Sequence, residues 1–76
     1  MSDNVSNALN FMDTRIHKVR ACIETYINKF GAISNSTMLT IIRTTENEVI
    51  KQCQLPNTRM IHNNLRVYLL DRLAEE

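Results

Sequence analysis

Apolar side chains recur along the first part of the chain with spacings that alternate between four and three residues. This is the period of a helix with one apolar face. The run ends directly before Gly31, and glycine adopts the left-handed conformation that ends helices without a steric penalty. The pattern predicts a helix over residues 5–30, about 40 Å long at the usual rise per residue. The repeating positions are Val5, Leu9, Met12, Ile16, Val19, Ile23, Tyr26 and Phe30.

Two further apolar segments lie on either side of Pro56. Polar residues that can cap a helix precede each of them, which predicts helices over residues 36–53 and 58–74. Within the first of these, Thr45 and Glu48 have the spacing of a capping box. The sequence therefore leaves open whether this helix is continuous or breaks near Thr45.

The predicted fold class is all-α, with three helices in a single domain over residues 1–76. The alternating spacing is also the heptad pattern of helices that pair. One interpretation is that the stripe packs only on the other two helices of the same chain. We favour the other, a dimeric helical bundle, because the first helix is long and a domain of 76 residues has a marginal core of its own. The predicted dimer seam is Leu9, Met12, Ile16, Val19, Ile23 and Tyr26.

The last predicted helix carries apolar side chains on more than one side. Met60 and Val67 lie opposite its main apolar face, and Leu70 lies near its back. A helix of this kind needs contact beyond a small core. These three residues are predicted either to extend the dimer seam or to bind a partner protein.

Composition and the lack of recognisable motifs argue against several classes of function. Nine Lys and Arg against eight Asp and Glu leave a formal charge of +1, and the two cysteines are too few for a disulfide scaffold. We find no apolar run long enough to span a membrane and no export signal, so we expect a cytoplasmic protein without membrane insertion. His17 and His62 stand apart from other metal ligands, and no phosphate loop or catalytic triad is recognisable. We therefore expect no enzyme activity, no metal and no cofactor.

DNA binding is the alternative function. Arg59, Asn63 and Arg66 share a face of the last helix, and Arg and Asn are the side chains that read guanine and adenine. The low net charge provides little of the phosphate attraction on which DNA binding depends. The simpler interpretation of these residues is a solvated helix face.

Over residues 18–73 the chain resembles the small bacterial regulators of biofilm formation and acid resistance of the YmgB/AriR type. The resemblance begins with an amphipathic helix that ends near Gly31. The motifs that carry it further are Ile33-Ser34-Asn35-Ser36-Thr37-Met38-Leu39-Thr40-Ile41-Ile42, Thr45-Glu46-Asn47-Glu48 and Leu65-Arg66-Val67-Tyr68-Leu69-Leu70. The stretch around Pro56 is a few residues longer than in that family. The resemblance implies a dimeric, non-enzymatic helical protein that acts as a connector to a two-component phosphorelay or modulates transcription. The expected client is a sensor kinase or a phosphotransfer protein. A further alternative is a protein inhibitor encoded by a phage or plasmid, which would have the same composition.

Overall fold

The computed structural model describes residues 2–75, with side chains from residue 5 onward. The two ends of the predicted 1–76 domain lie outside the described residues. The described chain forms three helices and no strand: α1 (Ser2–Phe30), α2 (Asn35–Cys53) and α3 (Arg59–Ala74). The all-α, three-helix prediction is confirmed.

Polar side chains and a left-handed glycine define three of the helix ends. Ser34 accepts a hydrogen bond from the Thr37 backbone N–H (3.1 Å) at the start of α2, and Thr58 does the same for Ile61 (3.2 Å) at the start of α3. Gly31, with φ +83°, follows the end of α1. The end of α1 and the starts of α2 and α3 therefore follow from local chemistry that the sequence contains.

Helix α2 runs without a break through Thr45. The Thr45 hydroxyl donates to the Ile41 carbonyl oxygen one turn earlier (3.0 Å) rather than accepting from the backbone ahead of it. The same backward bond is made by the neighbouring Thr44 to Thr40 (2.8 Å). A threonine engaged in this way stays inside a helix, so the possible break at Thr45 does not occur.

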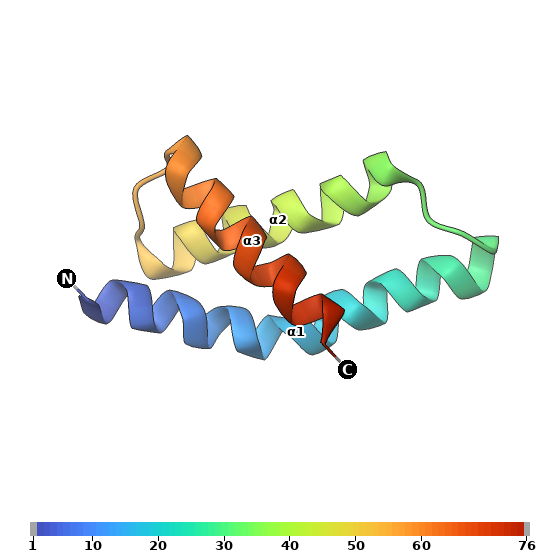
Figure 1. Ribbon diagram of the computed structural model, residues 1–76, viewed down its shortest axis with the longest axis horizontal. Helices are drawn as coiled ribbons and strands as arrows, with labels where there is room; N and C mark the ends of the chain where they lie inside the picture. Colours follow the sequence, from blue (N-terminus) through green and yellow to red (C-terminus); the bar gives the residue numbers. More distant parts are fainter. Residues whose placement is uncertain (1, 76) are drawn as a thin grey trace.

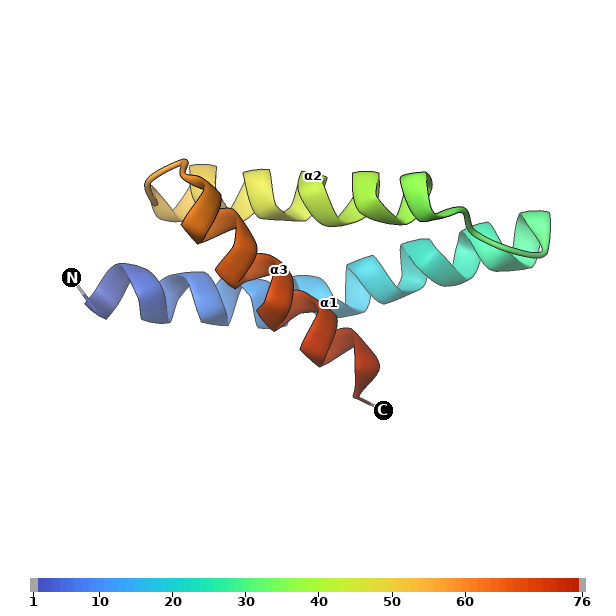
Figure 2. The ribbon, with the colours of Figure 1, turned by 45° about the horizontal axis from the view of Figure 1, so that its top comes forward.

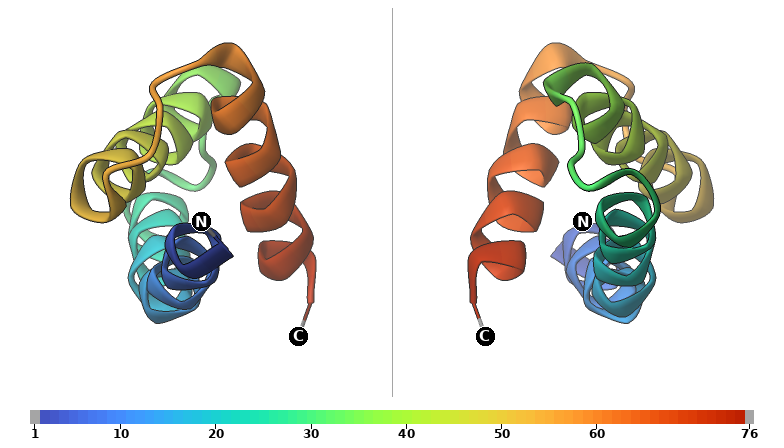
Figure 3. Two further views of the ribbon diagram at one scale, coloured as in Figure 1. Left: turned by 90° about the vertical axis from the view of Figure 1, so that its left-hand side faces the viewer. Right: turned by 90° about the vertical axis from the view of Figure 1, so that its right-hand side faces the viewer.

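Helices α1 and α2 run in opposite directions, and α3 crosses both of them, as Figures 1 and 2 show. Viewed along the long axis, the three helices occupy the corners of a triangle (Figure 3). The apolar faces of the three helices meet inside it. The buried core cluster consists of Ala8, Met12, Ile16, Ile42, Val49, Ile50, Leu65 and Leu69.

Arg20 holds the end of α3 against α1. Its guanidinium donates to the carbonyl oxygens of Arg72 (3.1 Å), Leu73 (3.2 Å) and Glu75 (3.0 Å). Carbonyl groups at a helix C-terminus lack partners inside the helix and carry partial negative charge, which an arginine satisfies. The contact fixes where α3 stops along α1.

The core fills only one end of the molecule. Helix α1 has 29 residues but α3 has 16, so α3 spans only about 24 Å at 1.5 Å per residue, against a longest dimension of 43 Å. Figures 1 and 2 both show the α1–α2 connection extending beyond α3. From Arg20 to Ile41 no side chain is buried. We call residues 20–41 the hairpin tip.

Candidate interaction surfaces

The hairpin tip exposes large apolar side chains where α3 no longer covers α1 and α2. On α1 they continue the stripe beyond Val19, which is buried, and on α2 they precede the buried Ile42 by one turn. The core face of both helices thus continues onto the tip. We call this surface the tip face. Its residues are Ile23, Tyr26, Ile27, Phe30, Met38 and Leu39.

Phe30 is the most exposed member, with 66% of its surface accessible. The Tyr26 and Phe30 rings lie 5.8 Å apart between centroids in a tilted arrangement, and the Lys29 ammonium lies 5.7 Å from the Phe30 ring. Exposed aromatic side chains that lie against each other are typical of protein contact surfaces.

The six residues of the predicted dimer seam divide between the core and the exposed surface. Met12, Ile16 and Val19 are buried within the single chain. They cannot also contact a second copy unless the helices separate. The other three predicted seam residues, Leu9, Ile23 and Tyr26, retain exposed surface, two of them on the tip face. The dimer itself stays a prediction.

The predicted partner surface on α3 is exposed. Met60 and Val67 have 70% and 68% of their surface accessible, and Leu70 lies one turn beyond Val67 on the outer side of the helix. These side chains are separate from the core residues Leu65 and Leu69 on the same helix. That they bind a partner is untested.

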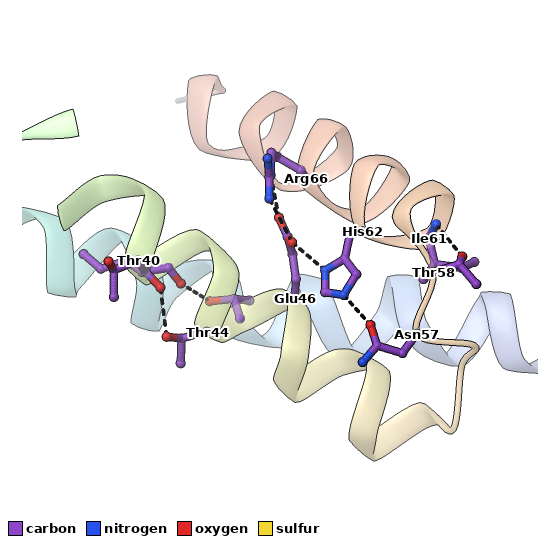
Figure 4. A network of polar contacts seen from close by, with 10 residues as sticks. Thr40, Thr44, Glu46, Asn57, Thr58, Ile61, His62 and Arg66 are labelled. Atoms are coloured by element: carbon purple, nitrogen blue, oxygen red, sulfur yellow. Dashed lines mark hydrogen bonds and ion pairs between the residues drawn. The ribbon is translucent and has the colours of Figure 1, made fainter. Parts of the chain in front are cut away.

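A buried carboxylate joins α2 to α3. Glu46 is completely inaccessible to solvent and accepts hydrogen bonds from Arg66 Nε to its Oε2 (2.7 Å) and from Arg66 Nη2 to its Oε1 (3.2 Å). His62 Nδ1 lies 2.8 Å from Oε1, and His62 Nε2 lies 2.7 Å from Asn57 Oδ1. Figure 4 shows these four side chains in line across the helix interface. Both carboxylate oxygens are satisfied, as a buried charge requires.

The contact with Glu46 affects the protonation of Arg66. The hydrogen bonds to the carboxylate, and secondly its negative charge, raise the pKa of the guanidinium above its ordinary value. A raised folded-state pKa stabilises the protein below the unfolded-state pKa, and that contribution is lost only as pH rises through the raised value. Arginine is a cation at physiological pH in any case, and the contact with Glu46 favours that charged form further.

An open pocket of about 380 Å³ adjoins this cluster. Arg59, Asn63 and Arg66, the predicted nucleic-acid residues, all line it. Glu46 already occupies one edge of the Arg66 guanidinium, so only its outer edge is left for a ligand. Sequence reasoning missed the residues that α2 contributes, namely Arg43, Glu46 and Asn47.

A signal for Glu46 was present in the sequence. It lies four residues after Ile42 and three before Val49, so a carboxylate occupies a position on the apolar face of α2. His62 and Arg66, four residues apart, share one face of α3. Only the packing of α3 on α2 shows that the three side chains meet.

Cys22 is exposed and Cys53 is partly buried, and both are free thiols. Among the side chains that the structure describes, those of residues 5–75, no three from His, Cys, Asp or Glu gather closely enough to hold a metal ion. Nor does any helix in that range have the length and apolar character needed to cross a membrane.

Comparison with protein-family models, with curated proteins and with solved structures finds no match to this chain.

Proposed function

We propose that this chain is a small regulatory protein without catalytic activity, which acts through protein–protein contacts as a homodimer. The observation that supports this is the tip face. An unbroken segment of 22 residues, 20–41, contains no buried side chain, and the six large apolar side chains of the tip face all lie within it. Apolar patches gathered on one surface mark interaction sites in proteins of this size.

A second copy of the chain is the partner that the tip face fits best. Each tip consists of two antiparallel helices that lack a third helix as cover (Figure 1). Two such tips, related by a two-fold axis, would cover each other as four packed helices. Small domains commonly gain stability in this way. The seam we propose thus lies nearer to Gly31 than the one expected from the heptad pattern alone.

The outer face of α3 stays free in this arrangement, so that Met60, Val67 and Leu70 can bind a client protein. A sensor kinase or a phosphotransfer protein is the client expected from the resemblance to biofilm and acid-resistance regulators. The near-neutral charge of the chain also favours a protein client over DNA.

The test adds a negative charge to the tip face. Because Phe30 is exposed in the single chain, Phe30→Asp should leave the helices folded but place a charge inside the dimer contact. Asn28→Asp is the matched control, since Asn28 is exposed on the opposite side of α1 and gains the same charge. Sedimentation equilibrium should give the mass of two chains for the wild type and for Asn28→Asp, and of one chain for Phe30→Asp.

A circular dichroism melt of each variant checks that the helices persist. A wild-type chain that sediments as a monomer at high concentration would contradict the proposal, and so would a dimeric Phe30→Asp. A charged substitution at Ile16 would not test the dimer. Ile16 belongs to the core, so such a change would unfold the chain in any oligomeric state.

A further inference from the structure

The pocket between α2 and α3 is rich in groups that donate hydrogen bonds. Three of its lining side chains are arginines, Arg43, Arg59 and Arg66, and two are amides, Asn47 and Asn63. Arginine side chains from two helices line the same space, which is the arrangement that proteins use to bind phosphate and carboxylate groups.

Arg66 is held in place for such a role. Glu46 engages its Nε and one hydrogen of Nη2, which is one edge of the guanidinium. The Nη1 group has no hydrogen-bond partner among the described residues, so a second edge of the fork remains available. A guanidinium fixed by a buried carboxylate loses less freedom when it binds an anion than a mobile one does.

Arg43 and Arg59 supply charge that nothing in the described chain neutralises. Both are exposed, and neither forms an ion pair with a side chain of residues 5–75. The one carboxylate that lines the pocket, Glu46, is inaccessible to solvent, and both of its oxygens already accept hydrogen bonds. Arg66 offsets the negative charge of Glu46, so Arg43 and Arg59 supply the excess positive charge at the pocket.

The resulting charge is concentrated. Three guanidinium groups against one carboxylate leave an excess of two positive charges at the pocket when His62 is neutral, whereas the whole chain carries only +1. A phosphate with two negative charges matches this excess better than a carboxylate with one. Its three terminal oxygens also provide acceptors for guanidinium and amide donors together.

We propose that this pocket binds a dianionic phosphate group, either inorganic phosphate or the terminal phosphate of a small monoester, through Arg43, Arg59 and the outer edge of Arg66. Asn47 and Asn63 donate to the remaining oxygens. The site lies on α2 and α3, away from the tip face, so it does not depend on the proposed dimer.

The experiment is an NMR titration of the ¹⁵N-labelled full-length chain in phosphate-free buffer at constant ionic strength. The pH is kept slightly above neutral, where phosphate is mostly dianionic. Inorganic phosphate, phenyl phosphate and a short DNA duplex are added in separate arms. We expect saturable shifts of pocket amides with inorganic phosphate or phenyl phosphate, and the tighter of the two identifies the source of the group.

The double variant Arg43→Gln with Arg59→Gln should weaken this binding by about tenfold or more. Lys18→Gln with Lys51→Gln is the matched control, because it removes the same charge from exposed positions outside the pocket. The control should weaken binding by less than about twofold, as expected for screened charges at a distance. Both double variants change exposed residues and should melt like the wild type.

Three outcomes overturn the proposal. Shifts that never saturate with either phosphate compound show that no site exists. An equal loss in the control variant shows a general effect of net charge. A saturable response to the duplex alone assigns the arginines to nucleic acid instead.

Discussion

Glu46 is the residue whose environment differs most from what its type implies. Glutamate is rarely buried without a partner, and here burial is complete because Arg66 and His62 converge on it. The partners are unequally exposed. The Arg66 side chain retains 30% of its accessible surface, whereas the Glu46 side chain retains none. The loss of stability should therefore depend on whether Arg66 or Glu46 is removed.

At this scale we predict an asymmetry between two substitutions. Arg66→Met leaves a carboxylate without solvent and with a single bond from His62, whereas Glu46→Met leaves a guanidinium that water can still reach. Arg66→Met should therefore lower the melting temperature further than Glu46→Met does. The double variant should recover most of the loss, because an apolar pair can replace a buried ion pair at little cost. Thermal melts followed by circular dichroism measure all three, and equal or additive losses would count against the burial argument.

Among the helices, α1 and α2 are each followed by a loop, and their C-terminal ends are built differently. After α1 the left-handed residue is Gly31, with φ +83°, a conformation that suits glycine. After α2 the left-handed residue is Gln54, with φ +55°. The backbone N–H groups of Gln54 and Leu55 both donate to the Ile50 carbonyl oxygen, the bonds that commonly end a helix. A residue with a Cβ atom is strained in that conformation.

Gln54→Gly should relieve this strain and stabilise the chain by about 1 kcal/mol. Gln52→Gly offers a matched control two residues earlier. It is also an exposed glutamine, but it lies inside α2, where glycine costs about 1 kcal/mol. Urea denaturation should show shifts of opposite sign for the two variants. Shifts of the same sign would mean that the left-handed conformation carries no strain.

On the scale of the whole molecule, one short helix closes the core. Leu69 of α3 has no accessible surface, while its neighbour Leu70 keeps 43%. The same element thus contributes to the core on one side and presents the predicted client surface on the other. Stability and partner binding should therefore depend on different residues of α3.

Leu69→Ala should destabilise the fold by about 2–5 kcal/mol, because it leaves a cavity in the core. Leu70→Ala removes the same atoms from the surface and should cost less than about 1 kcal/mol. Chemical denaturation compares the two directly. A large loss in Leu70→Ala would indicate that its side chain is covered by a second copy in solution.

The three helices and most of their ends could be predicted from the sequence alone. Local rules suffice for this, because the apolar period and the capping residues Ser34 and Thr58 act within a few positions of the chain. The sequence also placed Met60, Val67 and Leu70 outside the main apolar face, and all three are exposed in the structure.

Which part of the long stripe belongs to the core depends on how the three helices pack on one another. The heptad pattern treats Met12 and Tyr26 alike, but Met12 is buried and Tyr26 is exposed, because α3 crosses α1 near its middle and does not extend over the part that follows Arg20. The pairing of Glu46 with Arg66 likewise joins residues 20 apart. Such contacts depend on the angle and length of helices packed together, which no local pattern encodes.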